Sequence, residues 1–139
     1  MQIKQIAIPF IMPIKATEKA GAFDIYMPVS GTADGVARKY GLGFAAAVPE
    51  GHVALLLPRS GTGAKHGLEL NNTCGVIDSD YRGEWIATLR TKSGLPFSWE
   101  SGERIIQFMI VPIANVSLEL VNELDETKRG EGGFGSTGK

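Results

Sequence analysis

The chain has 139 residues, 43% of them hydrophobic, which is enough for one globular domain with a buried core. Its 14 basic and 15 acidic residues leave a formal net charge of −1, and this balance disfavours binding to nucleic acid or to an anionic membrane. A polyanion would have to be bound by a few placed cations, which suits a small phosphorylated ligand. Cys74 is the single cysteine, so an internal disulfide is excluded and a structural zinc site is disfavoured.

The first 14 residues are apolar, but Lys4, Pro9 and Pro13 interrupt them, and apolar side chains alternate along residues 6–14. That period of two predicts a strand over residues 2–14 rather than a signal-peptide core, and the prolines place it at a sheet edge or on a neighbouring subunit. No segment approaches the roughly 20 apolar residues that cross a membrane. We expect a protein that is not exported and that works in the reducing cytoplasm.

Short alternating segments predict most of the remaining fold. Along residues 22–28, Phe23, Ile25 and Met27 share one face, so Asp24 is expected to point away from the core. Further strands are predicted within residues 30–43, where turns surround a short strand, and over residues 52–58, 84–91, 104–112 and 116–121. This spacing predicts an all-β fold, an antiparallel jelly-roll-like barrel with one short helix.

The helical signal lies in residues 58–67. Ser60 is a suitable N-cap, Gly67 can close the C-terminus, and Lys65 falls in the last turn. The free N–H groups at the start of such a helix, next to the Arg59 guanidinium, would form an anion site. An ordinary connector explains the same residues equally well.

Residues 75–84 read GVIDSDYRGE, two apolar residues that run into an acid-rich turn. Because Trp85, Ala87 and Leu89 alternate directly afterwards, the segment predicts a β-hairpin with acids and an aromatic ring at its tip. Taken alone, an Asp-x-Asp turn is more typical of a solvated loop than of a catalytic site.

Residues 130–139 contain five glycines, a composition typical of a flexible arm. Its end, GFGSTGK, matches the first part of a P-loop, but without the Ser/Thr and helix that follow in that motif we do not expect a P-loop nucleotidase. Instead, the N–H groups of the arm and Arg129 could close over phosphates while Phe134 stacks on a flat ring.

Five segments together resemble the five motifs of the homotrimeric dUTPases, which hydrolyse dUTP to dUMP and pyrophosphate. They are residues 20–25, 58–68, 75–84, 102–107 and 129–138, and the third and fifth are the most specific. The resemblance implies a jelly-roll subunit, with a β core over residues 1–124 and a mobile arm over residues 125–139. It also implies a threefold trimer whose active sites lie at subunit interfaces, each closed by the arm of another subunit. Such an enzyme limits uracil incorporation into DNA and supplies dUMP for dTMP synthesis.

The resemblance also implies a role for each matching residue. Asp78 would orient and deprotonate the attacking water, Tyr81 would lie under the deoxyribose, and Asp24 would be linked to Mg²⁺ through water. The uracil edge would be read by Asn72 and the backbone of Gly75, Val76 and Ile77. The phosphates would contact Arg59, Ser60, Gly61 and Gln107. The lid would consist of Arg129, Phe134, Gly135, Ser136 and Thr137.

The chemistry of the residues agrees with these roles. A triphosphate needs Mg²⁺ and donors to neutralise the charge that shifts toward pyrophosphate, and the water needs a carboxylate in line with the α-phosphorus. An aromatic ring packed on C2′ would leave a ribose hydroxyl without space or partner, and a tight hairpin would reject the 5-methyl group of thymine.

Some residues depart from the family pattern. Ala22 and Phe23 stand where the family usually has a glycine and a smaller apolar residue, Thr62 replaces a common leucine, and Ile106 a common alanine. We interpret these as packing changes. One alternative is dCTP deaminase or a bifunctional relative, which the intact Asp78 to Tyr81 segment disfavours. A second is a nucleotide-binding regulatory protein.

Other reactive or aromatic side chains receive structural interpretations. Cys74 has no matched base, and His52 and His66 lack metal-ligand spacing. We expect Trp85 and Trp99 to pack in the core or at a subunit interface.

Overall fold

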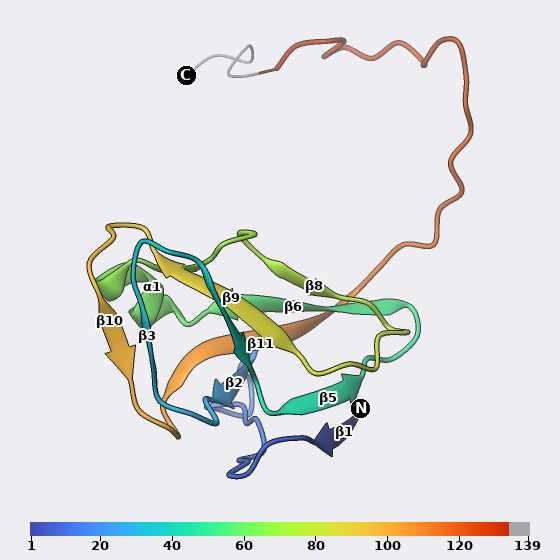
Figure 1. Cartoon of the computed structure of the whole chain (residues 1–139). Coiled ribbons are helices and arrows are strands. Elements are labelled where there is room, and N and C mark those ends of the chain that lie inside the picture. Colours follow the sequence, from blue (N-terminus) through green and yellow to red (C-terminus); the bar gives the residue numbers. More distant parts are fainter. Residues whose placement is uncertain (134–139) are drawn as a thin grey trace.

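The structure is a computed structural model and describes residues 1–133 (Figure 1). This part of the chain forms short strands and one helix. In chain order they are β1 Gln2–Gln5, β2 Phe23–Tyr26, β3 Gly31–Ala33, β4 Arg38–Gly41, β5 Phe44–Ala47, β6 His52–Pro58, α1 Ser60–His66, β7 Leu68–Leu70, β8 Gly75–Ile77, β9 Ile86–Thr91, β10 Phe97–Trp99 and β11 Arg104–Pro112. None of the helical structure described here is long and apolar enough to cross a membrane.

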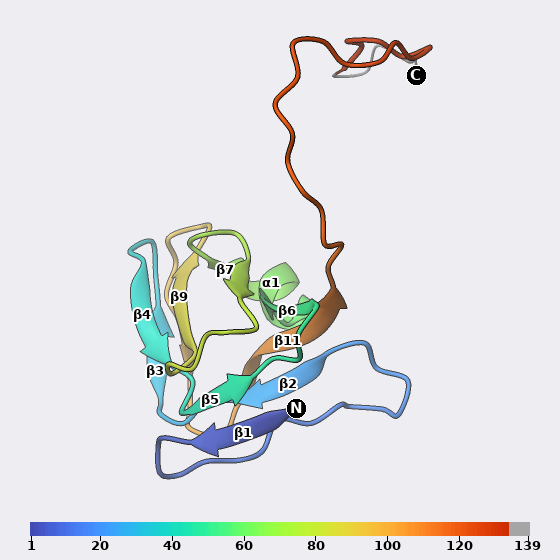
Figure 2. The same cartoon turned by 90° about the vertical axis from the view of Figure 1, so that its right-hand side faces the viewer.

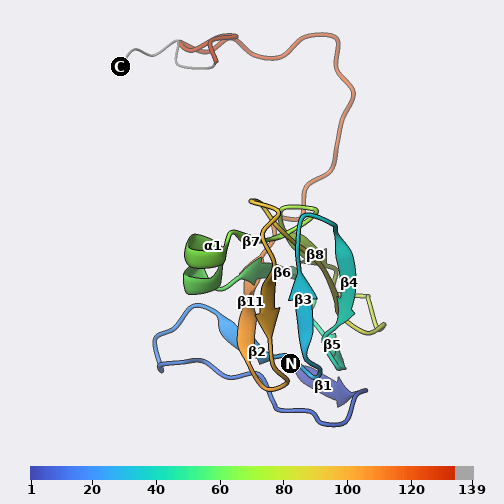
Figure 3. The same ribbon diagram turned by 60° about the vertical axis from the view of Figure 1, so that its left-hand side comes forward.

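Every pairing between these strands is antiparallel. The largest sheet has the order β2-β11-β6-β8, a second has the order β4-β9-β7, and β1-β5 and β10-β3 form two-stranded ribbons. Figure 3 shows α1 at the outer side of this sandwich, next to β11. The all-β prediction with one short helix is confirmed.

Aromatic side chains fill the space between the layers. Phe44, Trp85 and Phe108 are each at most 1% exposed, and their ring centroids lie 5.1 Å apart for Phe44 and Trp85 and 5.2 Å apart for Trp85 and Phe108. Trp85, Ala87 and Leu89 are all fully buried, because alternate residues of a strand face the same side. The predicted alternation along this strand is therefore confirmed, and so is the interior position of both tryptophans, since Trp99 is also buried.

Two predicted strands, residues 52–58 and 104–112, coincide with β6 and β11. Two other predictions are wrong. The first strand ends at Gln5, and within residues 6–14 only Ile14 bridges another strand, at Asp24, because the prolines cannot supply ladder donors. Residues 30–43 hold two strands, β3 and β4, rather than one.

The predicted strand at residues 116–121 does not form. The body of the molecule ends at Pro112, the last residue of β11, and residues 113–133 extend away from it (Figures 1 and 2). No strand within residues 1–133 pairs with this segment, and Leu118 and Leu120 are 98% and 100% exposed. An exposed alternating segment of this kind has the pattern of a strand but lacks the sheet that would pair with it.

The predicted hairpin is also wrong. β8 pairs with β6, whereas β9 pairs with β4 and β7, so the two strands that flank residues 78–85 belong to different sheets. The acid-rich turn is a connection between the two layers of the sandwich. Its sequence pattern predicted both strands but could not predict that each would pair elsewhere.

Candidate active site

A buried carboxylate lies on β2, an edge strand of the large sheet. Asp24 is 5% exposed, and its two oxygens face two arginines, with Arg59 Nε 2.9 Å from Oδ1 and Arg104 Nη1 3.2 Å from Oδ2. Asp24 does point away from the apolar core, as predicted, but the arginines cover it. A buried charge is stable only when it is paired in this way.

The element that follows β6 places two further predicted residues beside this carboxylate. Arg59, and not Ser60, is the N-cap of α1, and it has extended backbone angles without a side-chain cap. Ser60 is therefore the first helical residue, which corrects the predicted cap. The helix ends as predicted at Gly67, which has the left-handed φ of 65° that glycine adopts without strain.

Five predicted residues from three elements line one hollow of about 580 Å³. They are Asp24 from β2, Arg59, Ser60 and Gly61 from the start of α1, and Gln107 from β11. Gln107 is opposite Asp24 on one side and Leu57 on the other, and its Nε2 donates to the Pro58 carbonyl over 3.0 Å. The rest of the hollow is lined by Ala16, Ala20, Gly21, Ala22 and Met109.

The acid-rich turn forms a second group of predicted residues. Asp78 is exposed, and Tyr81 is 42% exposed with its hydroxyl donating to the Glu84 carbonyl over 3.0 Å. Arg82 holds the turn from outside, because its Nη1 donates to the carbonyls of Ser79 and Tyr81. A Cβ at Gly83 would overlap the Tyr81 hydroxyl, so a larger residue there would displace the ring from this position. The turn thus presents a carboxylate and a ring to solvent on a rigid base.

The predicted uracil-reading residues adjoin this turn. Gly75 pairs with Leu56 of β6, and a Cβ on Gly75 would come within 2.9 Å of the Leu56 Cβ, so only glycine fits. Val76 is exposed, and Asn72 lies in the exposed bend before β8, where its carbonyl accepts the Cys74 N–H over 2.7 Å. The backbone of β8 and the Asp78 turn therefore form one continuous edge.

The two groups of residues do not meet within one chain. Ile77 is paired with Ala54, so Asp78 lies beside the start of β6, whereas Arg59 follows its last residue, Pro58. At about 3.3 Å per residue, the six positions between them span roughly 20 Å. The hollow and the turn are therefore at opposite ends of the same strand.

The chain is similar to known proteins over nearly its whole length. A family model described as dUTPase matches residues 9–138. The chain belongs to the dUTPase family. It is 39% identical over 138 residues to the deoxyuridine 5'-triphosphate nucleotidohydrolase of Shewanella sp. (strain MR-7), covering 96% of this chain and 91% of that protein. It is 40% identical over 146 residues to the protein of the same name from Dictyoglomus turgidum, covering 98% and 96%.

Solved dUTPase structures resemble the whole chain. A mutant dUTPase of Staphylococcus bacteriophage 80alpha with dUpNHpp has a TM-score of 0.89 and 27% sequence identity, covering 99% of this chain and 98% of that one. The similarity confirms the jelly-roll prediction as well as the family.

The fifth family motif is described only in part. Arg129 Nε donates to the Gly132 carbonyl over 2.7 Å, and Gly130 N donates to Thr127, so within residues 1–133 these two hydrogen bonds join residues of the arm to one another. The remaining predicted lid residues, Phe134, Gly135, Ser136 and Thr137, lie outside the described residues.

The sequence did not single out two arginines that contact the predicted site residues or their turn. Arg104 lies inside the fourth motif, yet its contact with Asp24 depends on strand pairing rather than on spacing. The sequence of Arg82 and its neighbours is typical of an exposed charge, but the Arg82 guanidinium donates to the backbone of the turn. The available signal in the sequence was that both arginines are charged residues inside segments that match family motifs.

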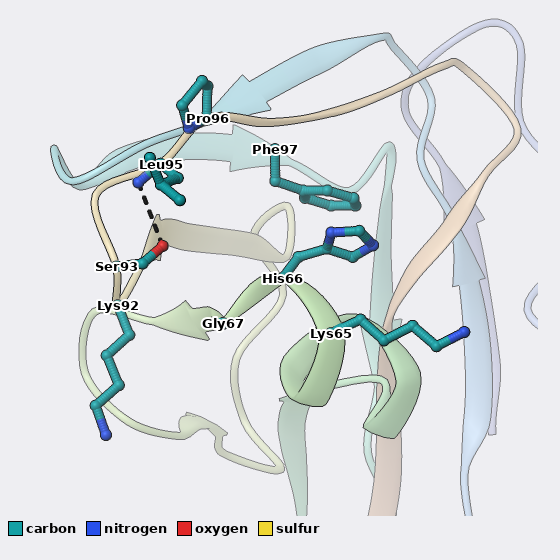
Figure 4. A pocket seen from close by; sticks show the side chains of 8 residues that line it. All are labelled: Lys65, His66, Gly67, Lys92, Ser93, Leu95, Pro96 and Phe97. Carbon is teal, nitrogen blue, oxygen red and sulfur yellow. Dashed lines mark hydrogen bonds between the residues drawn. The ribbon is translucent and has the colours of Figure 1, made fainter.

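A separate hollow of about 510 Å³ lies at the C-terminal end of α1 (Figure 4). His66 and Phe97 stack there with ring centroids 4.4 Å apart. The side chains of Lys65 and Lys92 point away from one another rather than toward a common centre (Figure 4). We assign no ligand to this hollow, and His66 keeps its structural interpretation.

Proposed function

We propose that the chain hydrolyses dUTP to dUMP and pyrophosphate, with water attacking the α-phosphorus. The observation that carries the proposal is the single hollow shared by Asp24, Arg59, Ser60, Gly61 and Gln107 in a member of the dUTPase family. The relatives named above carry the name of this activity. The phage structure with dUpNHpp, a triphosphate analogue, supports a nucleoside triphosphate as the ligand.

The hollow would bind the phosphates. Arg59 uses Nε for Asp24 and Nη1 for the Arg104 carbonyl, so its remaining N–H groups are available to phosphate oxygens. The first N–H groups of a helix have no intrahelical partner, which adds donors from Ser60 and Gly61. These donors would stabilise the negative charge that develops on the leaving pyrophosphate.

Mg²⁺ fits this site only through water. The described residues contain no cluster of three or more acids, histidines or cysteines that could form a protein cage for a metal. Both Asp24 oxygens accept from arginines, but each keeps a lone pair for a metal-bound water. Mg²⁺ commonly keeps several waters and binds substrate phosphates, and when bound it would neutralise their charge.

Asp78 would act as the general base. It is exposed at the end of β8, so it can accept a proton from a water held against the α-phosphorus. The Tyr81 ring, fixed by its bond to the Glu84 carbonyl, would pack on the deoxyribose and exclude a 2′-hydroxyl. Asn72 and the backbone of Gly75, Val76 and Ile77 would recognise the edge of the uracil ring.

The separation along β6 supports a homotrimer with shared sites. If each site needs both the hollow and the Asp78 turn, the turn must come from a neighbouring copy. Apolar side chains that would be buried by such neighbours are abundant, since Ile8 is 90% exposed and Leu118 and Leu120 almost fully exposed. Residues 113–124 would lie on a neighbour, and the arm over residues 125–139 would then bring Arg129 and Phe134 over the nucleotide.

Pyrophosphate release tests the proposal. dUTP, dCTP, dTTP and UTP are compared with and without Mg²⁺, and we expect turnover of dUTP alone, strongly reduced by removal of the metal. Deamination of dCTP would instead support the deaminase alternative, and tight binding of dUTP without turnover would support a regulatory protein.

A further inference from the structure

We propose that Arg104 and Tyr26 are positioning residues, which hold the Asp24 carboxylate so that Arg59 faces the phosphate hollow in one fixed orientation. The inference rests on the proposed dUTP hydrolysis and adds two residues to it. Neither residue was predicted as a site residue, and neither lines the hollow formed by Asp24, Arg59 and Gln107.

The contacts form a closed chain around one carboxylate. Arg104 Nη1 binds Asp24 Oδ2 at 3.2 Å, Arg59 Nε binds Oδ1 at 2.9 Å, and Arg59 Nη1 donates back to the Arg104 carbonyl over 3.1 Å. Arg59 is thus fixed by two acceptors, and both depend on where residue 104 lies. Loss of the Arg104 side chain would free one Asp24 oxygen and let the carboxylate turn toward Arg59.

Arg104 contacts Asp24 from the side away from the phosphate hollow. It lines a neighbouring hollow along α1, of about 550 Å³, while Arg59 lines both. Its guanidinium lies over the Tyr26 ring, with 5.6 Å between the central carbon and the ring centroid. A ring face of this kind attracts a guanidinium and limits its movement, so Tyr26 supports Arg104 as Arg104 supports Asp24.

A β-bulge makes this arrangement possible. Arg104 pairs with Tyr26 and Ile106 with Ile25, so the register shifts at the intervening Ile105. Ile105 and Ile106 are consecutive and both buried, which places Arg104 and Gln107, three residues apart, on the same outer face. In a regular strand, residues three apart would lie on opposite faces.

The charges explain why two arginines are needed. With Arg59 alone, the buried Asp24 carboxylate would cancel the charge of the guanidinium before phosphate arrived. With both, the cluster carries one net positive charge, and Arg59 retains free N–H groups toward the hollow. The planar shape of the Arg104 guanidinium matters as well as its charge. A lysine at this position would carry a point charge but would make no planar contact with the Tyr26 ring.

The test is a double-mutant cycle read by calorimetric binding of dUpNHpp without metal. Wild type, Arg104→Gln, Asp24→Asn and the double variant are compared, together with Arg104→Lys, Tyr26→Leu and Tyr26→Phe. Arg90→Gln is the control, because it breaks an arginine–carboxylate pair with Glu69 that lies on the other sheet, between β9 and β7, and is more exposed than the pair of Arg104 with Asp24. Pyrophosphate release from dUTP by the wild type is measured separately. A wild type that binds dUpNHpp but releases no pyrophosphate would contradict the proposed hydrolysis and not the positioning role of Arg104.

We expect Arg104→Gln to weaken binding on the order of tenfold in the wild-type background and by less than about twofold in the Asp24→Asn background. Arg104→Lys should recover little, and Tyr26→Leu should show a smaller loss that Tyr26→Phe largely restores. Equal losses in both backgrounds, full recovery by lysine, or unchanged binding in Arg104→Gln would each overturn the proposal. Should Arg104→Gln lose its fold by circular dichroism, Tyr26→Leu in the same two backgrounds decides the matter.

Discussion

Arg59 and Asp78 lie at opposite ends of β6, the first directly after the strand and the second beside its start. A phosphate bound at Arg59 is therefore roughly 20 Å along the sheet from the carboxylate of the same chain. A triphosphate cannot bridge that length and also place its α-phosphorus next to Asp78. The proposed chemistry thus requires Arg59 of one copy and Asp78 of another.

Complementation between two inactive variants would show the shared site. Arg59→Gln and Asp78→Asn should each be nearly inactive, but a mixture refolded together should regain up to about one quarter of wild-type activity, since one site in four receives both intact residues. Pyrophosphate release before and after joint refolding measures it. A mixture that stays inactive, or a fully active monomer in sedimentation, would contradict the shared site.

Asp78→Asn keeps the size of the side chain but removes its proton acceptor. Turnover of dUTP should fall by about 10²–10⁴, while affinity for dUpNHpp changes much less, because the phosphate contacts remain. Asp80→Asn is the matched control in the same turn. If Asp80→Asn is the more damaging change in steady-state kinetics, Asp78 is not the base.

Deletion of residues 128–139 should remove most turnover and barely change the melting temperature. In the described part of the chain, Arg129 and Gly130 bond to other residues of the arm, so the deletion should leave the packing of the body intact while it removes the proposed lid. Kinetics and thermal unfolding of the truncated chain measure both effects. Near-normal turnover would show that the arm is not a lid.

The Asp34 carboxylate is expected to make the stability of the fold depend on pH. A bond from Arg38 Nη1, at 2.7 Å, and a second from the Val36 N–H hold the pKa of Asp34 below its usual value. Because this pKa is lowered on folding, the stabilisation is present above the unfolded-state pKa of about 3.9 and is lost as pH falls through the folded value.

Asp34→Asn should therefore unfold at a lower temperature than wild type near pH 7, with the difference shrinking below about pH 4. Arg38→Gln should show the same pH pattern, because it removes the partner of the same bond. Thermal unfolding between pH 7 and 3 measures both. A difference that stays constant across this range would show that the pair does not stabilise the fold through its charge.

The sequence predicted the parts of the site that local pattern determines. β6 and β11 have the predicted bounds, and the second and fourth motifs contribute to the same hollow. Alternation could not predict that Arg104 and Gln107 share a face, because a bulge is a property of the pairing between strands. For the same reason the turn at Asp78 was expected to close a hairpin, although its two strands belong to different sheets.

The segment at residues 116–121 shows the other limit of local pattern. Its alternation is real, and a strand would form where a sheet edge is available, but the chain offers none in its described part. Burial of Leu118 and Leu120 would require the surface of another molecule. The local sequence pattern cannot indicate whether such a surface is present.

The burial of both tryptophans has a spectroscopic consequence. Trp85 packs against Phe44 and Phe108, and Trp99 packs edge-on to Tyr40 at 4.9 Å while its Nε1 donates to the Val29 carbonyl. Neither indole lines the phosphate hollow, although Trp85 is the last residue of the Asp78 turn. The intrinsic fluorescence of the protein will therefore report the integrity of the sandwich and will shift to longer wavelength on denaturation.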